Sequence, residues 1–218
     1  MTTGPDPLDE PVGSTTIAAF DFDGTLSRRD TLLPFLAQVA GAPAVARALS
    51  RAVVGSGRSL PRRDLAKETV LRQVLGGRPE AEVRAHGRAF AEAVVSTPRR
   101  LNEVAVNRLA WHREQGHRIV IISGSLELYL GEIARRWGAV ASGVRLEVVD
   151  GILTGRLLGP NVRGPEKLSR LDEALDDPAT RVVAYGNSGR DRELLERADE
   201  PYLYRRGRFV AYPRTHSA

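Results

Sequence analysis

The sequence contains no cysteine, and only two of its 32 basic residues, Lys67 and Lys167, are lysine. Without cysteine the chain has no disulfide, no thiolate zinc site and no cysteine nucleophile, and its composition fits a reducing compartment. Because arginine is used almost everywhere else, the two lysines indicate places where a compact ammonium is needed instead of a planar guanidinium.

Long apolar runs are also missing. The sequence has no stretch of about 18 uncharged apolar residues, the length that a membrane-spanning helix requires. Residues 1–14 contain several glycines and prolines and no basic residue, so we expect a loose tail and not a secretory signal. Residues 213–218 are expected to form a second tail. These features predict a soluble, cytoplasmic protein.

Three short apolar runs, at residues 15–20, 117–123 and 181–185, predict buried β-strands. Each is followed by small or polar residues and then by a helical pattern, which indicates parallel strands joined by crossover helices. Asp150-Gly151 between two apolar runs predicts a hairpin over residues 145–158. Gly164-Pro165 is expected to begin a helix that runs to about residue 175. The fold class is therefore α/β with a mostly parallel sheet.

Between the first two strands, residues 28–96 form a predicted helical insertion. Stretches with helical spacing at residues 31–40, 44–54, 62–75 and 80–95 are separated by glycine-containing breaks. Thr97-Pro98 is expected to begin the next helix, with Thr97 as its N-cap. The predicted α/β core then consists of residues 15–27 and 97–212.

The insertion is basic. Residues 28–100 hold 14 Lys and Arg against 6 Asp and Glu, or +8, whereas the rest of the chain holds 18 against 21, or −3. This asymmetry predicts an anionic partner, namely a phosphorylated substrate, a nucleic acid or the inner face of a membrane contacted peripherally. Arginine on solvated helical faces is the alternative explanation. The scarcity of interleaved aromatic residues argues against a nucleic acid.

Polar residues follow each predicted strand. They are Asp21 and Asp23, then Ser123-Gly124-Ser125, then the segment Gly186-Asn187-Ser188-Gly189-Arg190-Asp191. Because the carboxyl ends of parallel strands meet at one edge of the sheet, we expect these segments to converge. Carboxylates, hydroxyls and glycines at one edge suit a hard cation and a phosphate.

Asp21 and Asp23 leave the same face if the chain stays extended. One carboxylate can then attack phosphorus, and the other can exchange a proton with the leaving group and with water. An ordinary turn after a strand is the alternative for the segment from Asp21 to Thr25.

Two further residues fit phosphate binding. The Ser123 hydroxyl and the N–H groups of Gly124 and Ser125 would form a phosphate cradle at a helix N-terminus, with an N-cap serine as the alternative. Lys167 is predicted in the first turn of its helix, where the helix dipole opposes its charge. This favours a role in neutralising phosphate over that of a solvated lysine.

Two other patterns are excluded. Gly159 and Gly164 have the spacing of a P-loop but lack its lysine and hydroxyl residue. The histidines show no metal-ligand spacing and are expected at the surface: His86, His112, His117 and His216.

In this order, Asp21-x-Asp23-Gly24-Thr25, Ser123, Lys167 and Gly186-Asn187-Ser188-x-x-Asp191 resemble the four motifs of the haloacid dehalogenase-like hydrolase superfamily. The resemblance covers residues 15–204. The insertion resembles the small cap of the phosphoserine phosphatase-like branch, and residues 149–167 are similar to bacterial phosphatidylglycerophosphatase C-type members. The resemblance implies a Rossmann-like, mostly parallel core with a small helical cap after the first strand.

The same resemblance implies a Mg²⁺-dependent phosphate monoester hydrolase that acts through an aspartyl-phosphate. Asp21 would be the nucleophile and Asp23 the general acid and base. The phosphoryl group would be held by Thr25, Ser123, Gly124 and Lys167. Mg²⁺ would be bound by Asp21, the backbone carbonyl of Asp23, Asn187 and Asp191.

Two positions depart from the family pattern. Asn187 stands where an aspartate is usual, which removes a negative charge and predicts weaker metal binding. A weakly active or non-catalytic phosphate-binding regulator is therefore the alternative function, and Asp191 is either a metal ligand or the partner of Lys167. Asp30 stands where phosphoserine phosphatases of this branch carry a glutamate. With Lys67 it is expected to contact the substrate, and we expect a small or lipid-linked phosphate.

Overall fold

The computed structural model describes residues 16–55, 60–175 and 177–213, without the side chains of residues 53–55 and 60–63. The predicted tail over residues 1–14 and all but the first residue of the tail over 213–218 lie outside the described residues.

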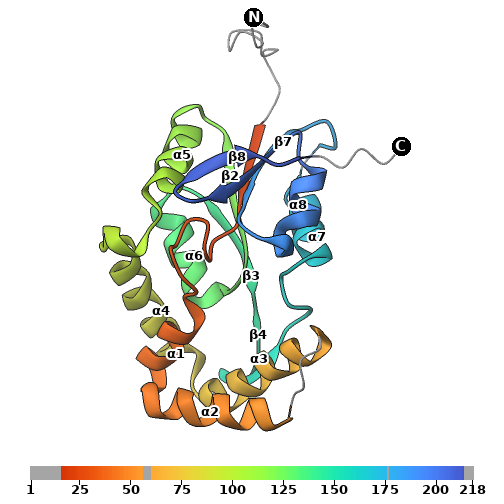
Figure 1. The fold of residues 1–218 in the computed structure, drawn as a ribbon. Helices are drawn as coiled ribbons and strands as arrows, with labels where there is room; N and C mark the ends of the chain where they lie inside the picture. Colours follow the sequence, from red (N-terminus) through yellow and green to blue (C-terminus); the bar gives the residue numbers. More distant parts are fainter. Residues whose placement is uncertain (1–15, 56–59, 176, 214–218) are drawn as a thin grey trace, which may run out of the picture.

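A six-stranded sheet forms the centre of the molecule (Figure 1). Its order is β3-β2-β1-β6-β7-β8. All neighbouring strands in it are parallel except β8, which runs antiparallel to β7. β1 lies between β2 and β6 and is buried along its whole length, as its uninterrupted apolar run predicts. The mostly parallel α/β core is confirmed. The strands are β1 (Thr16–Phe20), β2 (Arg118–Leu126), β3 (Val140–Val144), β6 (Arg181–Gly186), β7 (Glu200–Arg205) and β8 (Arg208–Ala211).

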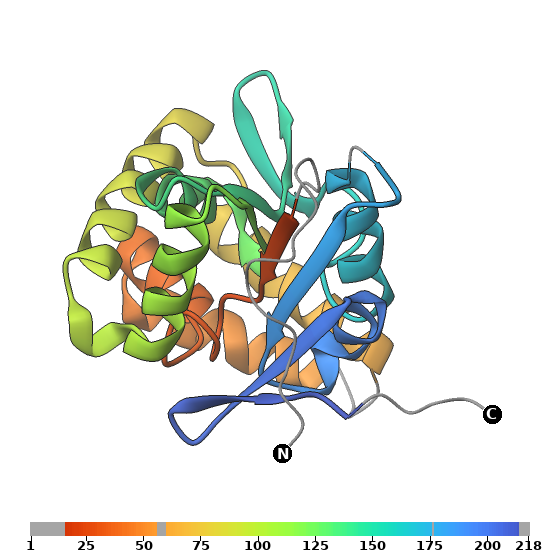
Figure 2. The same cartoon turned by 90° about the horizontal axis from the view of Figure 1, so that it is seen from above.

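Helices cover both faces of this sheet (Figure 2). One face carries α5 (Glu103–Glu114) and α6 (Glu127–Arg136), and the other carries α7 (Pro165–Ala174) and α8 (Arg192–Arg197). Each helix turns apolar residues toward the sheet, including the fully buried Leu130, Ile133, Leu171 and Leu194. This layering leaves the carboxyl ends of the strands accessible at one end of the core.

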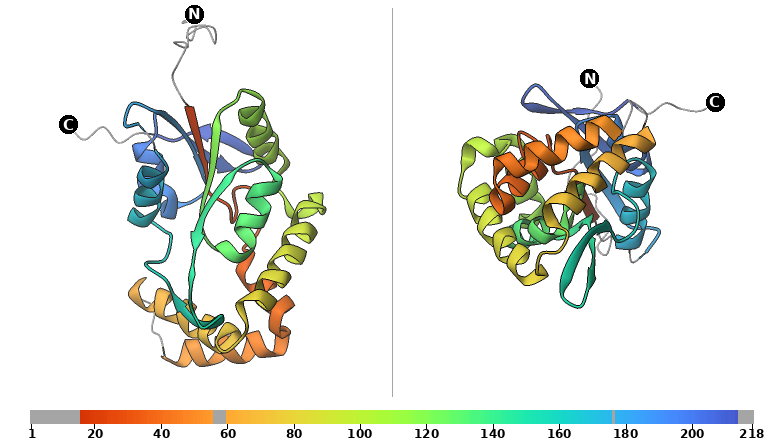
Figure 3. Two further views of the ribbon diagram at one scale, coloured as in Figure 1. Left: turned by 180° about the vertical axis from the view of Figure 1, so that it is seen from behind. Right: turned by 90° about the horizontal axis from the view of Figure 1, so that it is seen from below.

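Four helices form a cap over that end (Figures 1 and 3). They are α1 (Leu32–Ala40), α2 (Ala42–Gly55), α3 (Leu60–Leu75) and α4 (Glu80–Val95). α4 packs closely on α6, because a Cβ at Gly87 would come within 2.3 Å of the Leu128 carbonyl oxygen. The predicted helical cap after the first strand is confirmed. Among the described residues, no helix is both long and apolar enough to cross a bilayer.

The predicted hairpin is formed by β4 (Leu146–Val149) and β5 (Ile152–Leu157), with positive φ at Asp150 (51°) and Gly151 (77°). It packs against the cap, since a Cβ at Gly155 would lie 2.4 Å from the Arg72 Cα. Backbone hydrogen bonds also join it to the segment between α3 and α4: Gly77 N–H to Leu153 O, Leu153 N–H to Arg78 O, and Glu80 N–H to Gly151 O. The hairpin and the cap thus form one structural unit.

The helix expected from Thr97-Pro98 is only a 3-10 turn, η1 (Pro98–Arg100), and Thr97 makes no side-chain capping bond. The long helix α5 begins at Glu103, after Asn102. The Asn102 amide does not cap α5; it donates to the carbonyl oxygens of Gly24, Thr25 and Ser27. The break before α5 therefore lets Asn102 hold the loop that follows β1.

The surface position expected for His112 is wrong, because this side chain is only 1 % exposed. Its Nε2 lies 2.8 Å from the Tyr185 hydroxyl, and its Nδ1 lies 2.7 Å from the Nδ1 of His117. Burial and the neighbouring His117 lower the pKa of His112 to about 3. The imidazole is therefore a neutral link between α5 and β6.

Candidate active site

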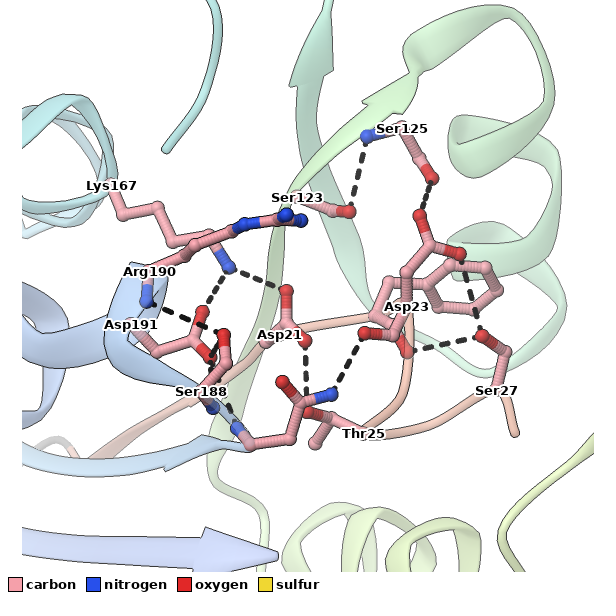
Figure 4. Close-up of polar contacts among 12 residues, drawn as sticks. Asp21, Asp23, Thr25, Ser27, Ser123, Ser125, Lys167, Ser188, Arg190 and Asp191 are labelled. Atoms are coloured by element: carbon pink, nitrogen blue, oxygen red, sulfur yellow. Dashed lines mark hydrogen bonds and ion pairs between the residues drawn. The ribbon is translucent and has the colours of Figure 1, made fainter. Parts of the chain in front are cut away.

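The carboxyl ends of β1, β2 and β6 and the underside of the cap enclose a cavity of about 490 Å³. All three polar segments at the strand ends contribute to its wall, together with cap residues and the loop before α7. The structure therefore brings together side chains that are far apart in the sequence, as Figure 4 shows for those at the strand ends.

Asp21 lies buried at the base of the cavity, directly after β1. Its N–H donates to the Tyr185 carbonyl, which fixes the backbone against β6. Its Oδ2 accepts the Thr25 hydroxyl at 2.8 Å, and its Oδ1 accepts the Lys167 ammonium at 2.5 Å (Figure 4). Burial raises the pKa of Asp21 to about 6, against the opposing charge of Lys167. The carboxylate is thus oriented by two donors.

Lys167 is almost fully buried, and its ammonium bridges Asp21 and Asp191 at 2.5 Å each. It reaches the site from the first turn of α7, which begins at Pro165 after Gly164 at φ 56°. Burial disfavours the charged ammonium, but the two carboxylates outweigh it and hold the pKa of Lys167 above its usual range. A permanent positive charge therefore lies beside Asp21.

Asp191 organises the loop after β6. Its Oδ2 accepts the N–H groups of Asn187 and Ser188 and the Ser188 hydroxyl, while its Oδ1 accepts Lys167. Burial alone would raise the pKa of Asp191, but Lys167 and these N–H donors hold it below its usual range. Gly186 is needed here, since a Cβ would lie 2.6 Å from that of Asp191. Of the two roles considered for Asp191, these contacts are those of a partner for Lys167.

The Asp23 carboxyl group is turned away from Lys167, toward Ser125 and Ser27 (Figure 4). Its Oδ2 accepts the Ser125 hydroxyl at 2.6 Å, and its Oδ1 accepts the N–H and hydroxyl of Thr31 at 3.0 and 2.7 Å. The Thr31 hydroxyl also lies 3.0 Å from that of Tyr129. Burial raises the pKa of Asp23, although the Ser125 hydrogen bond opposes the shift. This carboxyl group is therefore tied to Thr31, the residue that precedes α1 of the cap.

Ser123 and Gly124 line the cavity at the end of β2. The strand continues to Leu126 and α6 begins at Glu127, so the expected helix N-terminus starts farther along the chain than Ser123. The Ser123 hydroxyl accepts the Ser125 N–H at 3.1 Å. A Cβ at Gly124 would lie 3.4 Å from the Val162 carbonyl oxygen and 3.9 Å from the Lys67 Nζ, which are ordinary contact distances.

Four polar side chains join the cap to the core above this site. The Lys67 ammonium donates to the Gly124 carbonyl at 2.6 Å and to the Asn161 Oδ1 at 2.7 Å. Asp64 accepts the Asn161 amide at 2.7 Å and pairs with Arg163 at 2.5 Å. Burial lowers the pKa of Lys67 to about 8, against the raising effect of nearby carboxylates. Lys67 thus lines the cavity and also links the cap to the core.

The other cap residue expected to meet substrate, Asp30, is exposed and lines the cavity. Its Oδ1 accepts the Leu32 N–H at 3.0 Å, which helps to begin α1. Sequence reasoning did not single out Thr31, Asp64, Asn161, Arg163 or Arg190 as site residues. None of the first three stands in a recognisable motif, because their partners are remote along the chain.

The donor set beside Asp21 fits a hard cation. No cluster of three or more acidic or histidine side chains suited to a metal occurs among the described residues. The expected ligands are mixed, however, and include the Asp23 carbonyl and the Asn187 amide oxygen, which is the hard-oxygen chemistry of Mg²⁺. The Asn187 Nδ2 donates to that carbonyl at 2.8 Å. If the Asn187 amide were rotated by half a turn, its Oδ1 would lie beside the Asp23 carbonyl oxygen. A cation bound between these two oxygens would stabilise that arrangement.

Comparison with known proteins agrees with this geometry. The family model described as "HAD: haloacid dehalogenase-like hydrolase" matches residues 18–196. The chain belongs to this family. Protein CicA of Caulobacter vibrioides (strain NA1000 / CB15N) is 38% identical over 189 residues, which cover 84% of this chain and 83% of that protein.

A second relative places the chain in the phosphoserine phosphatase-like branch of the family. The phosphoserine phosphatase of Halobacterium salinarum is 31% identical over 188 residues, which cover 84% of this chain and 82% of that protein. A crystal structure of a protein with unknown function from Bordetella pertussis Tohama I has a TM-score of 0.70 at 25% identity, and the match covers 86% of this chain and 89% of that one. This haloacid dehalogenase-like hydrolase is therefore a phosphatase.

Proposed function

We propose that the protein hydrolyses small or lipid-linked phosphate monoesters in a Mg²⁺-dependent reaction, through an aspartyl-phosphate on Asp21. The observation that carries this proposal is the buried Asp21 carboxylate, which Lys167 and Thr25 orient at the base of the cavity. A nucleophile held in this way needs little rearrangement to reach an incoming phosphorus atom.

In the first step, an Asp21 oxygen attacks phosphorus and the bond from phosphorus to the ester oxygen breaks. Asp23 supplies the proton that the departing oxygen requires, and its raised pKa suits this role. In the second step, Asp23 takes a proton from water while the water oxygen attacks phosphorus. The bond from phosphorus to Asp21 then breaks and inorganic phosphate leaves.

We expect several groups to hold the phosphoryl oxygens during these steps. Lys167 supplies positive charge, and Ser123 and Gly124, which line the cavity, supply hydroxyl and N–H donors. The Thr25 hydroxyl already donates to Asp21, so its contribution is to orient the nucleophile. Mg²⁺, held by Asp21, the Asp23 carbonyl and Asn187, would neutralise further phosphate charge. Asp191 contributes by fixing Lys167 and the loop after β6.

The size of the cavity supports a small substrate or the head of a lipid. A volume of about 490 Å³ under a cap suits a compact phosphate ester and excludes a folded protein. The relative from Halobacterium salinarum is named for phosphoserine. Asp30 faces the cavity, where a carboxylate could accept a substrate amine. Phosphoserine and phosphatidylglycerophosphate are therefore the two substrates to compare, and the basic cap would favour an anionic lipid surface in the second case.

A substrate panel tests this proposal. We expect Mg²⁺-supported release of phosphate from at least one small or lipid monoester, and loss of that release in Asp21→Asn. Thermal unfolding of Asp21→Asn would establish that the variant is folded. The proposal would be wrong if the purified protein released no phosphate from any monoester, or if Asp21→Asn matched the wild type.

One observation favours a less active site as the second candidate function. Asn187 donates to the carbonyl expected to bind Mg²⁺, so the metal competes with this hydrogen bond. Asn187→Asp separates the two candidates. A large gain in Mg²⁺ affinity and turnover would indicate a phosphate-binding protein with little catalysis, and an unchanged turnover would indicate an adequate enzyme.

A further inference from the structure

Four cationic side chains line the cavity, and three of them already have protein partners. Lys167 pairs with two carboxylates, Lys67 donates to Gly124 and Asn161, and Arg163 pairs with Asp64. Arg190 is different: among the described residues, no acceptor is bound to its guanidinium. Because Arg190 is exposed and its guanidinium has no acceptor among the described residues, its donors are free for a ligand.

The backbone of Arg190 is held firmly in place. It lies in the 3-10 turn η2 (Gly189–Asp191), which a capping box between Ser188 and Asp191 closes. The Arg190 carbonyl accepts the Gly164 N–H at 3.0 Å, which joins this turn to the start of α7. The same helix carries Lys167, so the two cations are positioned by one connected piece of backbone.

The Arg190 side chain shares the cavity with the nucleophile, because Asp21, Ser123, Lys167 and Arg190 all line it. In the view of Figure 4 the Arg190 side chain extends from its 3-10 turn past Lys167 in the direction of Ser123. Lys167 and Ser123 are two of the groups expected to hold the phosphoryl oxygens. A phosphoryl group on Asp21 would therefore lie in the cavity that the Arg190 side chain also lines.

The charge of the site adds a second argument. The buried centre holds two carboxylates, Asp21 and Asp191, against the single ammonium of Lys167. A phosphate dianion entering this centre requires further positive charge, and an asparagine at position 187 adds no negative charge to hold a cation. A guanidinium provides charge together with paired donors that match phosphate oxygens.

We propose that Arg190 binds the oxygens of the phosphoryl group that is transferred, together with Lys167 and Ser123. This assignment rests on the proposed function and adds to it a substrate-contacting residue at a position that the fourth motif leaves unspecified. It also predicts that Arg190 acts on every monoester alike, because the phosphoryl group is the part that all substrates share.

Binding of inorganic phosphate without metal, measured by calorimetry, is the direct test. Arg190→Ala is expected to weaken binding by about 10- to 100-fold, the usual effect of losing a charge-assisted pair of hydrogen bonds. Arg190→Lys should recover part of it. Arg192→Ala is the matched control, since Arg192 lies two positions on and pairs with Glu196 away from the cavity. Unchanged phosphate binding in Arg190→Ala, or none in the wild type, would overturn the assignment.

Kinetics with p-nitrophenyl phosphate, which has no second anionic group, give the second readout. We expect kcat/KM to fall in Arg190→Ala by the same order as phosphate affinity, and added guanidinium to restore part of it. A loss confined to substrates with a second anion would instead place Arg190 on the leaving group and overturn the assignment. Phosphate binding that depends on Arg190 in a protein without turnover would overturn the proposed function and leave Arg190 as a residue that binds phosphate without transferring it.

Discussion

Replacing Lys167 by methionine removes the positive charge from the most buried ion-pair cluster in the described part of the molecule. The side chains of Lys167, Asp21 and Asp191 are only 3%, 8% and 1% exposed. Without the ammonium, two neighbouring carboxylates stay buried with no cation between them. Removing one partner of a buried pair usually costs about 3–5 kcal/mol of stability. We therefore expect Lys167→Met to lower the free energy of unfolding by that amount at neutral pH.

Urea denaturation measures this loss. With a slope of about 1–3 kcal/mol per M, the unfolding midpoint should fall by at least about 1 M. Arg170→Met is the control, because Arg170 lies one turn along α7 and pairs with Glu166 and Glu173 nearer to solvent. Its loss is expected to be smaller than that of Lys167→Met, because Arg170 and its two partners are more exposed than the Lys167 cluster and water can replace the lost contacts. If the two variants were equally stable, the Lys167 cluster would not be the strongly coupled group inferred from its burial.

The remaining predictions concern the proton donor, a buried histidine and a glycine. Asp23→Asn should reduce turnover of alkyl phosphates by about 10²- to 10⁴-fold and that of p-nitrophenyl phosphate much less, because nitrophenolate leaves without a proton; equal losses would exclude Asp23 as the acid. The neutral His112 has a folded-state pKa of about 3, whereas in the unfolded chain its pKa is about 6.5. As the pH falls below about 6.5, His112 therefore binds a proton in the unfolded chain but not in the folded one. Stability should then drop by up to about 1.4 kcal/mol per pH unit between these values, and His112→Gln should remove that slope in urea titrations at pH 7.5 and 5; an unchanged slope would contradict the assignment. Gly24→Ala should destabilise more than Gly77→Ala, since both glycines have positive φ (86° and 80°) but only at Gly24 does a Cβ come within 2.1 Å of Asn187; equal unfolding midpoints would contradict the close approach.

The sheet and the residues at its edge could be predicted because their signals are local. The run before Asp21 is apolar from Ile17 to Phe20 and pairs on both sides, and the Asp150-Gly151 turn has the φ angles that its sequence predicts. Lys167 was recognisable because an almost lysine-free chain places it in the first turn of a helix. The strand and turn signals lie within about ten residues of sequence, whereas that of Lys167 also uses the composition of the whole chain.

The contacts between cap and core could not be predicted in this way. Asp64 and Arg163 are 99 positions apart, and neither has a sequence pattern that indicates the other. His112 was expected at the surface because its partner, Tyr185, belongs to a strand far along the chain. The end of β2 was misjudged for a related reason: pairing with β3 extends the strand to Leu126, beyond the small residues that suggested its end. In all three cases the structure depends on contacts between residues that are far apart in the sequence.

Trapping the covalent intermediate tests the central claim most directly. Enzyme mixed with substrate and Mg²⁺ and quenched into borohydride should carry homoserine at position 21, since borohydride reduces an acyl phosphate but leaves a free carboxylate unchanged. Peptide mass spectrometry would locate the change, with substrate-free enzyme as the control. The account predicts reduction at Asp21 alone. Rapid phosphate release with Asp21 unmodified, or reduction at another carboxylate, would contradict it.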